Sequence, residues 1–258
     1  MIERLDRYWR VCATGLCFSS FGIGGLCLRL IAFPLLNVAV WPRPRRTLVA
    51  RSLVGAAMRS FVWMMHTVGV LSYEVRGAEK LDRTGLLILA NHPSLIDVVF
   101  LISLVERPDC VVKAALLGNA FTRGPVRMAG FICNESGVDL VSDAIASVRS
   151  GNNLIIFPEG TRTPRSGALQ FQRGAAHIAV RGGLNITPVV IRCRPPTLAK
   201  GDKWYQVPSR RARFEIAVGD DIAVATFCND PAGDAMAARR LTEHLSDYFA
   251  LELARADA

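Results

Sequence analysis

An uncharged apolar run near the N-terminus constrains this chain more than any other feature. Val11–Leu28 contains 18 residues without a charge, and Leu30–Val40 is apolar again after a single Arg29. About 20 apolar residues are enough to cross the hydrocarbon core of a bilayer. Pro34 and the glycines before it weaken a single straight helix, so the run predicts either a membrane span or a shallow re-entrant hairpin. A cleaved signal peptide is a third reading, but no small-residue cleavage site stands at the right distance.

The charges that follow this run predict its orientation. Five arginines and no acid come after it, namely Arg43, Arg45, Arg46, Arg51 and Arg59. The more positive flank of an apolar segment belongs on the cytoplasmic side. We therefore expect the protein at the inner (cytoplasmic) membrane, with its main domain facing the cytoplasm.

A second segment, Leu48–Leu71, has the pattern of an amphipathic helix. Arg51, Arg59 and His66 are spaced 8 and 7 residues apart, which places them on one helical face. This pattern predicts a helix in the membrane interface with its arginines toward anionic lipid, although an ordinary core-packing helix fits it too. Residues 1–71 are thus expected to be membrane-associated helices, and residues 72–258 a separate domain.

Composition excludes several classes of protein. A mean hydropathy of +0.27 is too polar for a multi-span transporter. The net charge of +9 suits nucleic acid, anionic lipid or a phosphorylated substrate, but no nucleic-acid recognition motif is present and the arginines cluster beside apolar segments. The seven cysteines are odd in number and contain no CxxC pair, so we expect reduced packing residues and no metal site. The Gly-x-Ser-x-Gly elbow of a serine hydrolase is also missing from the sequence.

The rest of the chain alternates between strand and helix patterns, which predicts an α/β fold with a mixed sheet flanked by helices. The expected strands are Tyr73–Arg76, Leu86–Ala90, Cys110–Lys113, Asn153–Phe157, Ile186–Arg192 and Phe214–Val218. The expected helices are Leu95–Glu106, Asp139–Arg149, Phe171–Arg181 and Asp234–Leu253.

Two polar motifs follow predicted strands, where α/β sites are built. In the first, Asn91–Asp97, the carboxylate of Asp97 is placed to fix the tautomer of His92 and leave its other nitrogen free to accept a proton. Ser94 and Asp97 also have the spacing of a helix capping box, which is a purely structural reading. In the second, Phe157–Thr163, a carboxylate, a glycine and a guanidinium come together and suit a polar head group, or form a surface turn with an ion pair.

Together these blocks resemble the glycerolipid acyltransferase family, typified by 1-acylglycerol-3-phosphate acyltransferases. Further matching blocks are residues 113–134 and Ile186–Val189, and the similarity covers roughly residues 70–195 in the family's order. The resemblance implies an O-acyltransferase that uses acyl-ACP or acyl-CoA and a lipid acceptor, with no cofactor or metal. A membrane scaffold with an inactive site is the non-enzyme alternative.

The resemblance also implies residue roles. His92 matches the catalytic base and Asp97 its orienting partner, with direct attack of the acceptor hydroxyl on the thioester. Acceptor binding is implied for the second motif, with Glu159, Gly160, Thr161 and Arg162, and for basic residues near the 113–134 block, namely Lys113, Arg123 and Arg127.

One block departs from the family pattern. Asn134 or Glu135 stands where the family has an Arg that grips the acceptor phosphate. Neither side chain supplies a guanidinium's charge or fork, although Arg123 and Arg127 lie close upstream. An acceptor other than lysophosphatidic acid, such as an ornithine lipid or an aryl polyene lipid, is therefore an alternative.

Overall fold

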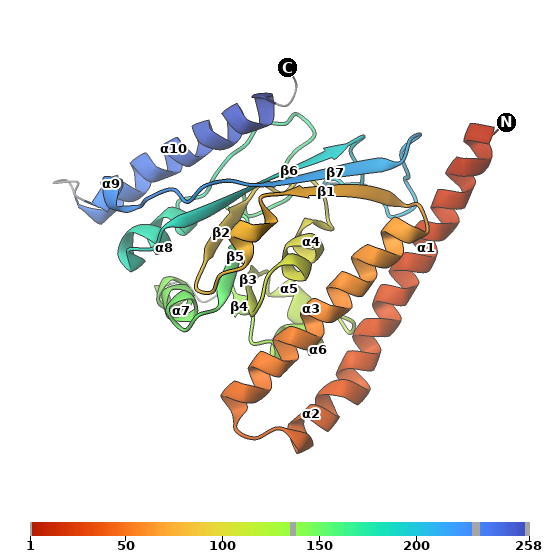
Figure 1. Cartoon of the computed structure of the whole chain (residues 1–258), viewed down its shortest axis with the longest axis horizontal. Coiled ribbons are helices and arrows are strands. Elements are labelled where there is room, and N and C mark those ends of the chain that lie inside the picture. The colour runs from red at the N-terminus through yellow and green to blue at the C-terminus, as the bar shows by residue number, and fades with distance from the viewer. Residues whose placement is uncertain (1, 135–137, 229–232, 256–258) are drawn as a thin grey trace.

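The computed structural model describes residues 2–134, 138–228 and 233–255, and a seven-stranded sheet forms its centre (Figure 1). The strand order is β1-β7-β6-β2-β5-β3-β4. The block from β6 to β4 is parallel, whereas β7 runs antiparallel to β6 and parallel to β1. The expected mixed sheet is confirmed, with the short β4 as an addition. The strands are β1 (Leu71–Arg76), β2 (Leu87–Ala90), β3 (Pro108–Val112), β4 (Ile132–Cys133), β5 (Asn153–Ile156), β6 (Ile186–Arg194) and β7 (Ala212–Val218).

Helices cover both faces of the sheet. In β2, Ile88 and Ala90 belong to one hydrophobic core and Leu87 and Leu89 to another, as expected when successive side chains point to opposite faces. The first core is shared with α3 (Arg43–Thr67) and α4 (Asp97–Leu104), and the second with α7 (Val138–Arg149), α8 (Gly174–Gly182) and α10 (Asp234–Arg255). Short helical turns lie at Ala78–Leu81, Ala115–Gly118 (α5) and Ala225–Cys228 (α9).

The N-terminal apolar run forms one arm of a helical hairpin, and α3 forms the other (Figure 1). The first arm contains α1 (Ile2–Cys27), a π-helical turn (Leu28–Ala32) and α2 (Phe33–Ala39). Pro34 lacks an N–H and its ring crowds the preceding turn, which accounts for the π-helical turn at this place. Both arms are long and apolar enough to cross a membrane by length and composition.

Two glycines let the first arm approach α6 (Arg123–Met128) closely. A Cβ on Gly25 would lie 2.5 Å from the carbonyl oxygen of Phe121, and one on Gly124 would lie 2.6 Å from the Cβ of Arg29. Such distances are below van der Waals contact, so any side chain at either position would force the backbones apart.

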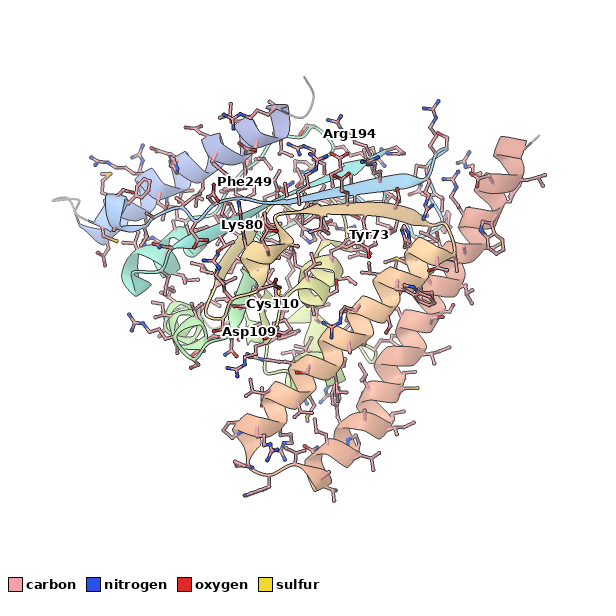
Figure 2. The ribbon with its side chains drawn as sticks, viewed as in Figure 1. Tyr73, Lys80, Asp109, Cys110, Arg194 and Phe249 are labelled. Atoms are coloured by element: carbon pink, nitrogen blue, oxygen red, sulfur yellow. The ribbon has the colours of Figure 1, made fainter. Side chains whose placement is uncertain are left out.

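Arg51 differs from its expected orientation toward lipid. It is 5% exposed, and its Nη2 lies 2.7 Å from Oδ2 of Asp109 on β3, which Figure 2 labels beside α3. Its Nε also donates to the carbonyl of Ala129 at 2.8 Å. Arg59 and His66 are exposed. The predicted position in the membrane interface is therefore wrong for Arg51, because this side chain holds α3 against the sheet. The helix also begins earlier than predicted, at Arg43 and not at Leu48.

Candidate active site

The loop after β2 is fixed by a side chain that continues the sheet pairing. The amide of Asn91 donates to the carbonyl of Ile191 at 2.8 Å, and its oxygen accepts the N–H of Ile191 at 2.7 Å. These two bonds replace the backbone ladder at the point where β2 ends. The next residue, His92, is thereby held at the carboxyl edge of the parallel block.

His92 and Asp97 meet at this edge. Nδ1 of His92 lies 2.9 Å from Oδ2 of Asp97, and the same oxygen accepts the N–H of Ser94 at 2.7 Å. Because an ionised carboxylate only accepts hydrogen bonds, Nδ1 is assigned the proton and Nε2 is left to accept one. The catalytic role of the pair stays a prediction.

Asp97 is fully buried, and only one of its oxygens has a hydrogen-bond partner in the described part of the chain. Burial raises the pKa of Asp97 to about 6, partly opposed by the hydrogen bonds from His92 and from the Ser94 N–H. The expected capping box is half formed. The carboxylate caps the Ser94 N–H, but the Ser94 hydroxyl donates to Thr197 at 2.9 Å and α4 begins only at Asp97.

Glu159, from the second motif, clamps the backbone of His92. Its Oε1 accepts the His92 N–H and the Thr163 hydroxyl, each at 2.8 Å, and the Thr163 N–H donates to the His92 carbonyl at 2.7 Å. The ring of Phe157 stacks on the imidazole, with 4.2 Å between centroids. Glu159 is buried, and this burial raises the pKa of its carboxyl. The ends of β2 and β5 are thus locked together around the imidazole.

Arg162 is also engaged with the protein. Its Nη1 donates to the carbonyls of Leu198 and Ala199, both at 2.9 Å. Leu198 has a φ of 51°, a left-handed conformation that a leucine rarely adopts, and its carbonyl also accepts the Leu95 N–H at 3.1 Å. The carbonyl of this strained residue therefore accepts hydrogen bonds from both motifs, through Leu95 and Arg162. Acceptor binding by Arg162 stays a prediction.

The other expected binding residues lie at more exposed positions. Thr161 is half-buried and Gly160 is exposed. The N–H of Gly160 donates to the Phe157 carbonyl at 3.0 Å, so this N–H is not free to stabilise an oxyanion formed in the reaction. Lys113 follows β3, which is separated from β2 by β5, so its backbone is about 10 Å away from that of His92. It is exposed.

The remaining cations lie on α6, where Arg123 and Arg127 are exposed. Within the described residues, no hydrogen bond or ion pair links Lys113, Arg123 or Arg127 to His92. Asn134 is exposed after β4, and its N–H pairs with Val112 at 3.0 Å. Glu135 lies outside the described residues.

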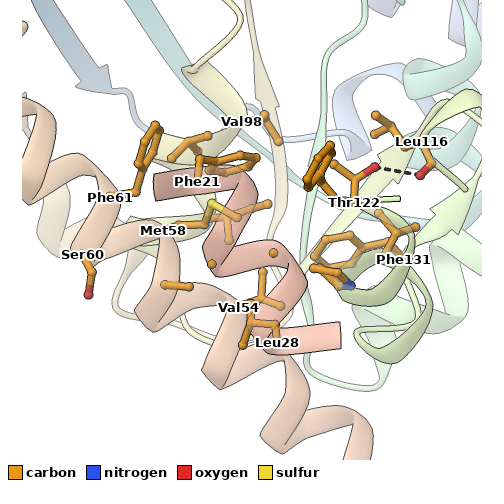
Figure 3. A pocket seen from close by; sticks show the side chains of 18 of the residues that line it. Phe21, Leu28, Val54, Met58, Ser60, Phe61, Val98, Leu116, Thr122 and Phe131 are labelled. Carbon is orange, nitrogen blue, oxygen red and sulfur yellow. Dashed lines mark hydrogen bonds between the residues drawn. The ribbon is translucent and has the colours of Figure 1, made fainter. Parts of the chain in front are cut away.

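An apolar cavity of about 370 Å³ lies between the helical hairpin, α4 and α6. Figure 3 shows Phe21, Met58, Val98 and Phe131 among the side chains around it. Val98 directly follows Asp97 on α4, so the cavity wall begins one residue from the His92–Asp97 pair. In the sequence, the glycines at positions 22, 24 and 25 are the signal nearest to it, but their pattern predicts only an interrupted helix.

The described residues contain no group of three or more His, Cys, Asp or Glu side chains able to hold a metal ion. Sequence reasoning missed four features of the site, namely Asn91, the stacking of Phe157, the Thr163 bonds and the 197–199 segment. Apart from the Thr163 hydroxyl, which bonds the nearby Glu159, each depends on a partner more than 60 residues away in sequence or on a backbone carbonyl, which no local pattern indicates.

Comparison with known proteins identifies related sequences. Residues 72–192 match the family model described as Acyltransferase. The chain is 31% identical over 137 residues to a 1-acyl-sn-glycerol-3-phosphate acyltransferase of Pseudomonas aeruginosa, covering 51% of this chain and 53% of the relative. It is 31% identical over 160 residues to the human beta enzyme of the same name, covering 56% and 54%. The chain thus spans about half the length of these curated relatives.

A solved structure shares the fold. The crystal structure of a 1-acyl-sn-glycerophosphate (LPA) acyltransferase from Thermotoga maritima matches with a TM-score of 0.66 and 18% identity, over 95% of this chain and 97% of that one. This likeness extends over the helical hairpin as well as the sheet.

The buried charge of Asp97 gives a testable prediction about stability. Because the folded pKa is raised from 3.8 to about 6, the native state binds the proton more tightly, so ionising Asp97 costs stability as pH rises from about 4 to 6. That difference corresponds to about 3 kcal/mol. Between pH 5 and pH 8, Asp97→Asn should therefore gain about 1–2 kcal/mol of stability relative to wild type, because the rest of the cost is already incurred below pH 5. Unfolding in detergent at the two pH values measures this gain.

The matched control is Asp82→Asn, which changes an exposed carboxylate. It should shift the unfolding midpoint equally at both pH values. A difference between Asp97→Asn and wild type that stays constant from pH 5 to pH 8 would contradict a raised pKa.

Proposed function

We propose that the protein transfers a fatty acyl group from an acyl-ACP or acyl-CoA thioester to a hydroxyl of a lysophospholipid-like acceptor, on the premise that residues 72–192 match the Acyltransferase family model. The observation that supports this most directly is the 2.9 Å contact between His92 Nδ1 and the buried Asp97. We further propose that residues 72–258 form the catalytic unit and residues 1–71 the membrane-associated helices.

The proposed reaction is a direct transfer. Nε2 of His92 removes the proton of the acceptor hydroxyl, and the hydroxyl oxygen attacks the thioester carbonyl. The tetrahedral intermediate then expels the thiolate, which takes the proton from His92, and Asp97 stabilises the imidazolium between the two steps. No bond between the acyl group and the enzyme is formed.

The cavity beside α4 suits the acyl chain of the donor. Its wall is almost entirely apolar, as is usual for sites that bind hydrocarbon groups. Val98 in the cavity wall is the next residue after Asp97, so an acyl chain placed there lies near the reacting pair. Direct attack at the thioester requires the acyl carbonyl to come close to His92.

We propose that the helical hairpin lies in the membrane interface. The ion pair of Arg51 with Asp109 holds α3 against the sheet, so a span by α3 would have to break this buried pair. Large apolar side chains are nevertheless exposed near the hairpin tip, which also contains the exposed Arg43 and Arg45. Arginines beside exposed apolar groups suit an anionic lipid surface, and the basic flank favours the cytoplasmic face of the inner membrane. The exposed apolar residues are Leu30, Ile31, Leu35, Val38 and Trp41.

A specialised lipid acceptor is the second candidate. Asn134 stands where the family resemblance implies a phosphate-binding Arg, and Arg162 is occupied by two backbone carbonyls. Both observations reduce the cationic contacts at the expected acceptor site. This candidate keeps the same reaction and changes only the acceptor head group.

The general base is tested by His92→Ala. Removing a positioned base should lower acyl transfer by roughly 100- to 10,000-fold while the circular dichroism spectrum stays that of the folded protein. The control, His66→Ala, removes an exposed histidine of α3 and should keep wild-type turnover. Full activity of His92→Ala, or a trapped covalent acyl-enzyme, would refute direct attack, and an inactive wild type would favour the scaffold reading.

Membrane docking is tested at the hairpin surface. Ile31, Leu35 and Val38 are 58%, 64% and 90% exposed, so replacing all three with Gln should not disturb the core. Since each such side chain buried in lipid contributes about 1.5–3 kcal/mol, co-sedimentation with anionic vesicles should weaken by at least about 10-fold. The control, Met236→Gln with Leu251→Gln on α10, should bind vesicles as wild type does. Equal binding of both variants would remove the hairpin from the interface.

The acceptor is tested by Asn134→Arg. A guanidinium should improve use of lysophosphatidic acid relative to a neutral or zwitterionic hydroxylated lipid by about 10-fold, because one charge-assisted bond contributes roughly 1.5–3 kcal/mol. Wild type should prefer the neutral or zwitterionic lipid when the two acceptors compete. The opposite result is a wild-type preference for lysophosphatidic acid that disappears in Arg123→Ala or Arg127→Ala.

A further inference from the structure

Residues 200–211, which we call the aromatic loop, lie within the connection between β6 and β7 and beside α1 (Figure 1). Trp204 and Tyr205 in this loop are 48% and 47% exposed, and their rings meet edge to face with 5.7 Å between centroids. The six-membered ring of Trp204 packs on α1, where a Cβ on Gly15 would lie 3.2 Å from it. Trp204 therefore contacts the first arm of the hairpin, while a large part of both aromatic residues stays exposed.

Hydrogen bonds hold the aromatic loop in place. The N–H of Gln206 donates to the Lys203 carbonyl at 3.0 Å, and the side-chain oxygen of Gln206 accepts the Lys203 N–H at 2.7 Å. At the other end of the loop, the buried Arg10 of α1 donates to the carbonyls of Pro208 and Ser209 at 2.9 and 2.7 Å. The two rings are thus exposed on a turn that is fixed at both ends.

The exposed apolar surface continues along α1. Leu5, Leu16 and Ile23 are between 57% and 62% exposed. They are 11 and 7 residues apart, close to three and two helical turns, so they lie on one face of the helix. Leu16 directly follows Gly15, the residue on which Trp204 packs, so this face passes beside the aromatic loop. Contiguous exposed apolar surface of this kind marks a site of interaction with a membrane or another molecule.

The aromatic loop is also basic. It contains four Lys or Arg residues and one acid, Asp202. The side chain of Asp202 is ion-paired with Arg165. In contrast, Lys200, Lys203 and Arg210 are exposed and take part in no ion pair within the ranges 2–134, 138–228 and 233–255. The loop therefore presents positive charge next to its two exposed rings.

We propose that the aromatic loop is a second lipid-binding element, which places Trp204 and Tyr205 among the head groups of an anionic membrane. Trp and Tyr suit this depth because each combines an apolar ring with one polar N–H or O–H group. Basic side chains beside them attract anionic head groups. An acidic protein would match the charge but leave the apolar face of α1 uncovered, so lipid fits the whole surface better.

This proposal extends the proposed docking of the hairpin, because it adds a contact made by the α/β part of the chain. The loop begins directly after Ala199, whose carbonyl accepts a hydrogen bond from Arg162 of the second motif. The lipid contact therefore lies next to the segment that holds this motif in place.

Insertion of Trp204 is tested by fluorescence quenching in the whole chain. The sequence contains four tryptophans, so Trp9→Phe, Trp41→Phe and Trp63→Phe together leave Trp204 as the only indole. Its emission should fall on anionic vesicles with brominated acyl chains relative to the same vesicles without bromine. In the control, Trp204→Phe is added and Leu251→Trp, at an exposed position of α10, supplies the indole. Its emission should be equal on both vesicles, because α10 covers the face of the sheet opposite α3.

The charges are tested by Lys203→Gln with Arg210→Gln, which changes two exposed side chains. At low ionic strength, this variant should bind anionic vesicles at least about 10-fold more weakly than wild type, because each basic residue near an anionic surface adds to the attraction. It should bind zwitterionic vesicles as wild type does. The control, Arg239→Gln with Arg255→Gln, removes two exposed arginines of α10 and should leave both affinities unchanged.

Trp204 that is not quenched on vesicles that bind the protein would overturn the proposal, as would equal binding of the Lys203 and Arg210 variant and its control. If the tryptophan substitutions prevent folding, the vesicle affinities decide alone. Binding of an acidic protein that needs Lys203 and Arg210, with Trp204 unquenched, would assign the loop to a protein partner and also overturn it.

The same measurements separate this proposal from the proposed function. Weaker vesicle binding after the three hairpin substitutions to Gln, with Trp204 unquenched when the hairpin is unchanged, would support the hairpin contact and refute the loop contact. Quenched Trp204 with no effect of the hairpin substitutions would do the reverse. Quenched Trp204 in a protein that transfers no acyl group would refute the proposed reaction and support the lipid contact of the loop.

Discussion

The burial of the Asp97 carboxylate is the constraint on which the rest of the site depends. A fully buried charge with a partner on only one oxygen is costly unless its donors are held rigidly. The donors are the Ser94 N–H and His92 Nδ1, and the backbone of His92 is fixed on one side by Glu159 and on the other by Thr163. The second motif thus acts first as a frame for the imidazole.

The frame extends to the helical hairpin through one irregular segment. Residues 197–199 accept hydrogen bonds from Ser94, Leu95 and Arg162. Nine residues after Ala199, the carbonyls of Pro208 and Ser209 accept bonds from the buried Arg10 of α1. The same stretch therefore contacts both the site and the first arm of the hairpin.

Local patterns predicted much of the fold. Parallel strands buried on both faces give continuous apolar runs, which is why β2 and β5 were recognisable, and a strand-to-helix turn brings His92 to Asp97 within five residues. The failures are long-range. Arg51 has the spacing of an interfacial residue, but Asp109, 58 positions away, draws it into the core. The start of α4 at Asp97 depends on Thr197 and Leu198, and the apolar cavity arises only when helices distant in sequence pack together.

Arginine usage shows why net charge alone says little about partners. Of the residues behind the +9 charge, Arg10, Arg51 and Arg162 donate mainly to backbone carbonyls and buried acids, where the planar guanidinium satisfies several acceptors at once. These three hold α1, α3 and the second motif in place. Arg43 and Arg45 at the hairpin tip are, in contrast, exposed beside exposed apolar side chains. Arginines in such surroundings suit an anionic lipid surface, as proposed for the hairpin, and do not need the extended basic face that nucleic acid requires.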